Sequence, residues 1–351
     1  MVAFFILTGI LCGGLIALYI TYQRASYSDG DIEVCAWSTL HNHVSLLDVP
    51  PISRSEFLSR QATLASALKE DGVDAYITEP SPSSLYYFNI STSYSLSERP
   101  FLAILSSTGS FSYLAPKFEL GRIAGLDMVY REKSVIEWKE EESPYSVLKR
   151  EFGSASSVKV MVDEHARFFI VSGLQAANFT VLPVTPAVAS IRAVKSSPEL
   201  QILRGINEFT VEAVRSLQPC IQVGMTQETL FSAASSIFKR AGVGLAFWAI
   251  VLFGEQAANP HGGSKGKSLG DGEFVLIDIG SVLHGYGSDV TRTILPAKGK
   301  VSQEMMDVWE LVHNAQSAAV ELMKNGTPCS TVDAASRFVP PSHATSHDPL
   351  P

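Results

Sequence analysis

The 351-residue sequence lacks the compositional marks of several protein classes. It has no cluster of Lys and Arg, and its formal net charge of −8 argues against nucleic-acid binding as its main activity. Its four cysteines, Cys12, Cys35, Cys220 and Cys329, are far apart and show no CxxC or Cys/His spacing. This spacing indicates neither a zinc finger nor a disulfide scaffold, although it leaves a single disulfide open.

What the chain does contain is enough apolar sequence for a sizeable core. Hydrophobic residues make up 46% and charged residues 18% of the chain, which is typical of a globular protein and not of a disordered or fibrous one. At about 150 residues per domain, the length predicts roughly two domains. Small molecules or peptides are the ligands that we expect.

Residues 2–23 form an uncharged segment rich in Phe, Ile, Leu, Ala and Gly. A helix of this length, at about 1.5 Å per residue, would cross a hydrocarbon core about 30 Å thick. A cleaved signal peptide is the alternative, but its usual basic start is absent here. The segment therefore predicts a hydrophobic helix at residues 1–23, acting as a single-pass anchor or a signal peptide, and a membrane or secreted location. Sequons at Asn89, Asn178 and Asn325 give weak support.

An α/β domain is expected next. Residues 24–52 are predicted to be a polar linker, because its final Pro50 and Pro51 cannot join a helix interior. Apolar residues then recur every three or four positions from Ser55 to Lys69, which predicts a helix, and Asp74–Thr78 resembles a strand. Further runs alternate between strand and helix patterns, so residues 53–193 form an α/β domain. The expected strands are Phe101–Leu105, Phe111–Leu114 and Val158–Val162, and the expected helices are Pro144–Phe152 and Arg167–Ala177.

A second domain is predicted over residues 194–337. Its first helix begins near Ser197, where an N-cap serine is followed by Pro198 and the acidic Glu199. Met305 and Trp309 lie on the apolar side of a long amphipathic helix, where we expect core positions. The remaining expected elements are a helix at Gln227–Arg240, strands at Leu245–Leu252, Glu273–Val282 and Ser288–Leu295, and the amphipathic helix at Ser302–Lys324.

Asp278 and Asp289 lie on neighbouring strands of a predicted hairpin, on either side of a turn at His284–Gly287. An ionised carboxylate buried in an apolar strand costs several kcal/mol unless it is paired, and two facing carboxylates repel each other. Bound cations are the simplest explanation for the pair. The alternative is that both acids merely flank the turn and are satisfied by backbone N–H groups and by Arg292.

Five runs of the second domain occur in a fixed order that identifies a family. They are Lys195–Leu200, Gly224–Gln227, Asn259–Gly262, Val275–Gly280 and Ser288–Thr293. Together they resemble the creatinase and Xaa-Pro aminopeptidase/dipeptidase family, the pita-bread metallopeptidases. Ser97–Phe101 and Glu141–Tyr145 are similar to the N-terminal domain of that family. The resemblance spans about residues 54–337 and implies a creatinase-type N-terminal α/β domain followed by an incomplete pita-bread (α+β) catalytic domain.

The resemblance also implies a metal site. Family members hold two ions of Mn, Zn or Co through two aspartates, one histidine and two glutamates. By motif match, Asp278 and Asp289 are the two aspartates, and His261 is the catalytic histidine that hydrogen-bonds the substrate. The implied chemistry is hydrolysis of the peptide bond before proline by a metal-activated water, with a proline-containing peptide as substrate. Alternatively, His261 is a simple loop residue beside Gly262.

The sequence departs from the family after Arg337. Family members continue through a Gly-His-Gly-Ile-Gly segment and two glutamates, whereas residues 338–351 contain four prolines and no glutamate. We expect an unstructured tail there and the loss of three of the five ligands, so that metal binding is weak or absent. His343 and His347 have i,i+4 spacing, but a proline-rich tail is a poor setting for a metal site.

Two functional hypotheses remain. In the first, the chain is an Xaa-Pro metallo-aminopeptidase or dipeptidase whose activity is impaired or lost because three of the five family ligands are absent from this sequence. In the second, it is a non-enzymatic remnant of the pita-bread fold that binds peptides or proteins. Creatinase-like C–N hydrolysis without metals is disfavoured because both aspartates are present. The sequence leaves a homodimer open.

Overall fold

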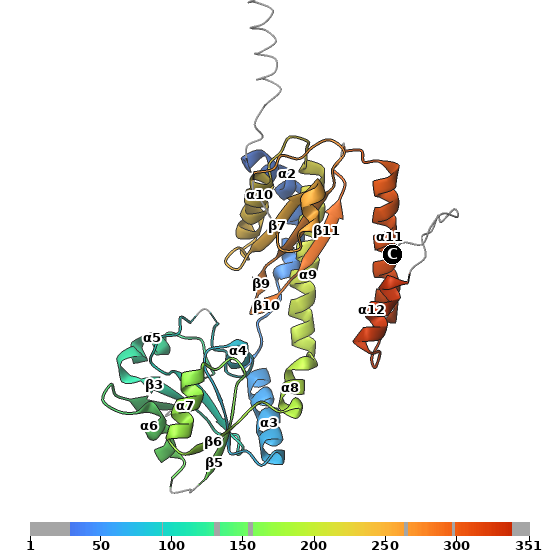
Figure 1. The fold of residues 1–351 in the computed structure, drawn as a ribbon. Helices are drawn as coiled ribbons and strands as arrows, with labels where there is room; N and C mark the ends of the chain where they lie inside the picture. Colours follow the sequence, from blue (N-terminus) through green and yellow to red (C-terminus); the bar gives the residue numbers. More distant parts are fainter. Residues whose placement is uncertain are drawn as a thin grey trace, which may run out of the picture. The chain divides into compact units, whose positions relative to one another are not determined.

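The computed structural model describes residues 29–338, apart from residue 93 and the segments 130–133, 154–156, 263–265 and 297–298. The chain divides into two compact units (Figure 1). The six-stranded unit comprises Leu46–Ile206 and Val282–Gly287, and the three-stranded unit comprises the rest. The predicted boundary at residues 193 and 194 lies close to the division, which falls after Ile206 within a long helix.

The six-stranded unit is built on a mixed sheet with the strand order β4-β3-β2-β1-β5-β6. Strand β1 is central, and it runs parallel to β5 and antiparallel to β2. All four residues of β1 are buried, because helices cover both faces of the sheet. The strands are β1 (Ala75–Thr78), β2 (Leu102–Ser106), β3 (Phe111–Pro116), β4 (Val135–Trp138), β5 (Val158–Val162) and β6 (Phe179–Leu182).

Two apolar clusters lie on the two faces of this sheet. Tyr76 of β1 packs with Leu64 and Val188 on one face, whereas its neighbour Ile77 packs with Leu148 and Leu174 on the other. Alternation of side chains along the strand explains this division. Helices α3, α4 and α8 therefore cover one face, and α6 and α7 cover the other (Figure 1). Their bounds, with the short α5, are α3 (Arg54–Glu70), α4 (Pro82–Phe88), α5 (Leu120–Ala124), α6 (Pro144–Glu151), α7 (Phe168–Ala176) and α8 (Pro186–Ala193).

The three-stranded unit contains an antiparallel sheet with the order β11-β8-β7. The predicted strands and helices of this part are confirmed, with ends shifted by a few residues. Helix α9 (Ser197–Leu217) contributes residues to both units, and the hairpin of β9 (Val282–Leu283) and β10 (Tyr286–Gly287) belongs to the six-stranded unit. The other elements are α10 (Gln227–Arg240), β7 (Trp248–Phe253), β8 (Val275–Gly280), β11 (Val290–Ile294), α11 (Gln303–Leu322) and α12 (Cys329–Arg337).

The predicted polar linker at residues 24–52 instead contains helical structure. Helix α2 (Asp29–Leu40) is followed by the 3-10 helix η1 (His41–Leu47). The side chains of Ile32, Ala36 and Leu40 are buried and recur every four residues, so they form one stripe. Helix α2 packs against α10. The stripe has only three members, and the apolar Val34 and Trp37 lie outside it, which is why the segment shows no clear helical pattern in sequence.

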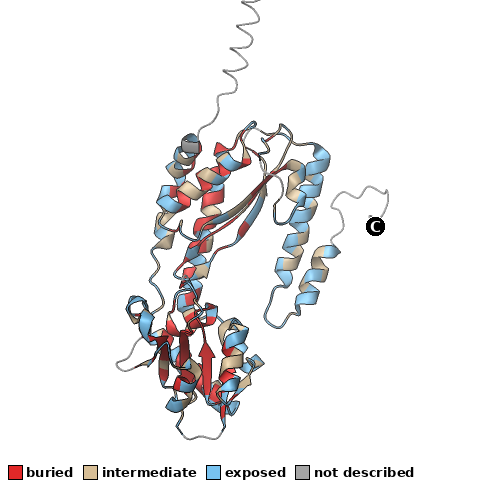
Figure 2. Cartoon of the chain, turned by 60° about the vertical axis from the view of Figure 1, so that its left-hand side comes forward, coloured by how far each residue is buried: buried red, intermediate tan, exposed pale blue. Residues whose placement is uncertain are grey.

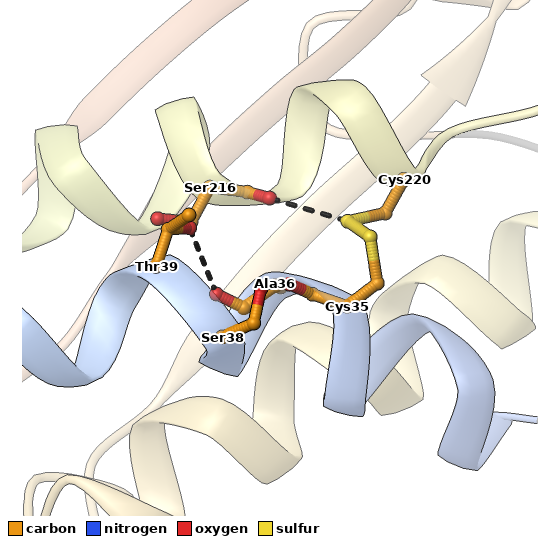
Figure 3. Close-up of a disulfide and its surroundings, with 6 residues drawn as sticks. All are labelled: Cys35, Ala36, Ser38, Thr39, Ser216 and Cys220. Atoms are coloured by element: carbon orange, nitrogen blue, oxygen red, sulfur yellow. Dashed lines mark hydrogen bonds between the residues drawn. A yellow bond between two sulfur atoms is a disulfide. The ribbon is translucent and has the colours of Figure 1, made fainter.

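A disulfide between Cys35 and Cys220 attaches α2 to the rest of the three-stranded unit (Figure 3). Cys35 lies on α2, and Cys220 ends the short 3-10 helix η3 (Gln218–Cys220) that follows α9. The Cys220 sulfur is also 3.3 Å from the carbonyl oxygen of Ser216. The two cysteines are 185 residues apart in sequence, so they become neighbours only because the elements that carry them pack together.

The predicted membrane or secreted location is corrected by the structure. Residues 1–23, on which it rested, lie outside the described residues. Within the described ranges, no helix combines the length and the apolar character that a membrane crossing requires. The longest described helices, α9 and α11, carry charged side chains along their length, which explains this finding.

The apolar side of α11 was expected to be core, and this prediction is wrong. Met305 and Trp309 are each 37% exposed, and Val312 is 63% exposed. Helix α11 packs against α12, and both are largely exposed (Figure 2). The indole N–H of Trp309 donates a hydrogen bond of 2.9 Å to the carbonyl oxygen of Thr293 on β11. An amphipathic pattern therefore predicted the helix, but not what covers its apolar side.

Candidate metal centre

Asp278 and Asp289 lie on the same face of the three-stranded sheet. Asp278 on β8 pairs with Thr291 on β11, and Asp289 stands two residues before Thr291. Because side chains two residues apart on a strand share a face, Asp289 lies diagonally across from Asp278. Between them the chain turns through His284 and Gly285, whose φ angles of +50° and +86° are typical of a two-residue hairpin turn.

Gly280 allows the chain to approach closely beside the two aspartates. A Cβ at this position would lie 2.1 Å from the carbonyl oxygen of Ser288 and 2.7 Å from the ring of Trp248. Trp248 on β7 pairs with Gly280, so its ring covers the glycine on the face that carries Asp278. Only glycine fits without displacing the strand that leads to Asp289.

The two carboxyl groups interact directly. Burial raises the pKa of Asp289, and the charge of Asp278 and a hydrogen bond between the two groups raise it further. The hydroxyl of Thr291 donates a hydrogen bond of 2.6 Å to Oδ1 of Asp278. Among the described residues, neither aspartate forms an ion pair, and Arg292 donates to the carbonyl oxygen of Thr291. The predicted alternative, in which Arg292 satisfies the pair, is therefore not what the structure shows.

His261 lies in the loop between β7 and β8 and lines a cavity at the edge strand β7. Gly262, which follows it, is close enough to Ile250 that an added Cβ would be 4.0 Å from the Ile250 side chain. Ile250 on β7 pairs with Asp278, so its side chain shares the face of the aspartates. A cavity of about 440 Å³ is lined here by Ile250, His261 and Phe231. The cavity follows the edge strand β7 and helix α10, and Ile250 is the lining residue that shares the face of the two carboxylates.

These residues fit part of a metal site. Carboxylate oxygens are ligands that Mn²⁺ and other divalent cations accept, and a cation would relieve the repulsion that raises the pKa of Asp289. In the part of the chain that the structure describes, no group of three or more His, Cys, Asp or Glu side chains comes together. The described donors are therefore Asp278 and Asp289, with Thr291 orienting the first of them.

Comparison with known proteins identifies the family of the chain. The family model described as Metallopeptidase family M24 matches residues 201–344, and that of the Creatinase/Prolidase N-terminal domain matches residues 60–194. An uncharacterized peptidase of Schizosaccharomyces pombe is 42% identical over 314 residues, which cover 84% of this chain and 69% of the relative. The chain belongs to metallopeptidase family M24. The predicted creatinase-type and pita-bread resemblance is thereby confirmed.

Solved structures show the same fold for the family. The dipeptidase PepE from Mycobacterium ulcerans is similar with a TM-score of 0.73 at 23% identity, over 82% of this chain and 77% of that chain. A prolidase from Thermococcus sibiricus is similar with a TM-score of 0.68 at 23% identity, also over 82% of this chain and 77% of that chain. These likenesses support a creatinase-type N-terminal domain followed by an M24 domain.

Sequence reasoning missed two residues beside the candidate metal centre. Thr291 stands in the same motif run as Asp289, and the alternation of a strand could have placed it on the same face. Trp248 carries no such signal, because its position depends on the pairing of β7 with β8.

Proposed function

We propose that the chain is an Xaa-Pro type metallopeptidase in which Asp278 and Asp289 bind a divalent cation. The observation that carries the proposal is the diagonal pair of interacting carboxyl groups on one sheet face, beside the cavity that contains His261. Membership of family M24 supports metal-dependent peptide hydrolysis. The similar structures of a dipeptidase and a prolidase support a small, proline-containing peptide as substrate.

Each residue has a distinct role in this proposal. A divalent cation bound there would supply Lewis acidity toward a water nucleophile and the scissile carbonyl. Asp278, oriented by Thr291, and Asp289 would hold it. His261 would donate a hydrogen bond to the substrate, and the apolar wall at Ile250 would contact a substrate side chain. Because two carboxylates alone bind a divalent cation weakly, we expect weak metal affinity and impaired hydrolysis for this chain.

Titration calorimetry with Mn²⁺ tests the metal site. We expect the wild-type protein to bind Mn²⁺ weakly. The double substitution Asp278→Asn and Asp289→Asn should abolish the heat of Mn²⁺ binding, because both anionic ligands are lost. Asp271→Asn, which removes a different exposed aspartate of the same unit, is the matched control. Equal Mn²⁺ binding by the double variant and the control would exclude the proposed site.

Release of proline from a Gly-Pro dipeptide tests the activity separately. Any Mn²⁺-dependent rate should be lost in the double variant and lowered in His261→Ala, because these changes remove the metal ligands and the substrate contact. A rate that persists in the double variant would show that hydrolysis does not pass through this centre.

A second candidate function is metal-independent peptide binding. One observation favours it, because a groove of about 930 Å³ runs between β11 and the exposed apolar side of α11, with Met305, Trp309 and Thr293 among its lining residues. Strand β11 is at the edge of the described sheet, so its backbone could pair with an extended peptide. Peptide binding that is unchanged by EDTA and reduced by Trp309→Ala would favour this function over catalysis.

A further inference from the structure

A separate cavity of about 280 Å³ lies within the six-stranded unit. It lies where the parallel strands β1 and β5 end, because Asp163 follows β5 directly and Ser83 follows β1 on helix α4. In α/β sheets, ligands bind at the carboxyl ends of parallel strands. Every lining residue falls between Leu46 and Ile206, so the cavity is built without the residues of the metal centre.

Asp163 places a fixed negative charge in the wall of this cavity. Its side chain is buried, with 4% exposed, and its carboxylate accepts hydrogen bonds from the hydroxyls of Ser81 at 2.7 Å, Ser83 at 2.9 Å and Thr78 at 2.9 Å. Burial raises the pKa of Asp163, but the three hydroxyl bonds and the nearby His165 lower it below its ordinary value. Asp163 is therefore ionised at neutral pH.

Arg192 places a positive charge close to Asp163 without contacting it. Its Nη1 donates a hydrogen bond of 2.8 Å to the Ser83 hydroxyl, which in turn donates to Asp163. No direct ion pair joins the two charges in the described structure. Both line the cavity together with a second carboxylate, Glu164, which is 68% exposed and lies 3.9 Å from His165. A ligand inside therefore meets a guanidinium and the buried Asp163 carboxylate, which are separated by one hydroxyl group.

Tyr87 supplies a hydroxyl that has no hydrogen-bond partner. Its side chain lines the cavity and is 1% exposed, and its Oη is buried without a partner among the described residues. Burial raises the pKa of Tyr87, and its side chain lines the same cavity as Arg192 and Asp163. A buried polar group without a partner is unfavourable, and a polar ligand would satisfy it.

We propose that this cavity binds a free α-amino acid. The ligand carboxylate would bind Arg192, its ammonium group would bind Asp163, and Tyr87 would hydrogen-bond to one of them. A simple anion would be repelled by Asp163 and a simple cation by Arg192, whereas a zwitterion complements both charges. Val184 and Val188 line the same cavity and suit a small aliphatic side chain. The volume lies just below the usual range of about 300–1,000 Å³ for ligand pockets, which favours a very small molecule.

Titration calorimetry with L-valine in the presence of EDTA tests the ligand class. Isobutylamine lacks the carboxylate of valine, and 3-methylbutanoate lacks its ammonium group. We expect valine to bind at least about tenfold more tightly than either analogue, because each analogue leaves one cavity charge unmatched. An absence of valine binding, or equal binding by an analogue, would overturn the proposal.

Two substitutions assign the binding to this cavity. Tyr87→Phe removes only the unpartnered hydroxyl, so it should fold normally and weaken valine binding about tenfold. Arg192→Gln should weaken it at least as much. Tyr145→Phe is the control, since its hydroxyl bonds to the carbonyl oxygen of Phe169 away from the cavity lining. Valine binding that both cavity variants retain would refute the site.

The metal centre provides an independent check. Valine binding should be unchanged when Asp278 and Asp289 are both replaced by Asn, because those residues take no part in the cavity. Loss of valine binding in that variant, or its dependence on added Mn²⁺, would assign the ligand to the metal centre and reject the present inference. Failure of the proposed peptidase activity would leave the valine result intact.

Discussion

Asp289 is a residue whose ionisation opposes folding when no cation is bound. Its pKa is raised first by burial and then by Asp278. Between the ordinary carboxyl pKa of about 3.9 and the raised folded value, the folded state keeps a proton that the unfolded state releases. The free energy of unfolding therefore falls as the pH rises through this window.

Substituting Asp289 by Asn should remove this dependence. In EDTA, we expect Asp289→Asn to raise the melting temperature at neutral pH by a few degrees at most, because the side chain is largely exposed. The gain should shrink as the pH falls through the folded pKa of Asp289, since protonation neutralises the wild-type carboxylate. Thermal melting over a pH series measures this difference in melting temperature between the variant and the wild type. A pH-independent gain, or an equal gain in Asp271→Asn, would show that the carboxylate pair is not its origin.

The sequence indicates the candidate site residues more clearly than the neighbouring residues that orient or cover them. Asp278, Asp289 and His261 stand in motif runs, and the structure places the two aspartates diagonally on one sheet face, whereas His261 lines a cavity at the edge strand β7. The bond from Thr291 to Asp278 and the ring of Trp248 over Gly280 depend on strand register. Register is a property of pairing between distant segments, so a single run of sequence does not reveal it.

At the scale of elements, the end of β8 is the most tightly constrained point of the three-stranded sheet. Gly280→Ala would force a methyl group against the Ser288 carbonyl oxygen and the Trp248 ring. We expect it to lower the free energy of unfolding by about 3 kcal/mol, the upper end for overpacking, and to weaken Mn²⁺ binding. Urea denaturation measures the first effect.

Gly121→Ala provides the control for this substitution. Gly121 lies in helix α5, and an added Cβ there meets no atom within 4 Å. Alanine is also the better helix former, so this variant should be neutral or slightly stabilising. Equal stability of the two variants would mean that the strand can move aside at Gly280.

Elements with long periodic patterns were predictable, and short capped ones were not. The helix at α3 was expected from its apolar spacing and the helix at α9 from its N-terminal serine, proline and glutamate, and both are confirmed within a few residues. Helix α4 has seven residues, and its capping box joins Ser81 and Ser84 in a stretch whose serines and prolines resemble a loop. Helix α2 was missed for a related reason, because its buried stripe is short.

At the scale of the whole molecule, the disulfide joins two parts of one unit that are distant in sequence. The chain leaves the three-stranded unit after Ser45 and returns to it at Asn207. Cys35 precedes the departure and Cys220 follows the return. The sequence predicted two domains from length and motifs, but cysteine spacing alone did not indicate this connection. Its recognition required knowing that α2 packs within the three-stranded unit.

Loss of this disulfide should destabilise the three-stranded unit. We expect Cys35→Ser with Cys220→Ser to lower the free energy of unfolding by about 2–4 kcal/mol, because the unfolded chain gains freedom. Reductant should lower the melting temperature of the wild type to that of the double variant and leave the variant unchanged. Cys329→Ser, which replaces the exposed free cysteine, controls for thiol loss. Equal melting temperatures of oxidised wild type and double variant would contradict the expected role.

In covalent terms, the oxidised protein is a ring with two tails. The ring is closed by the bond from Cys35 to Cys220 and contains the whole of residues 46–206. A single proteolytic cut anywhere in that stretch opens the ring but releases no fragment. Two fragments would therefore separate on a denaturing gel only after reduction, and a nicked molecule would keep its two pieces together while it is oxidised.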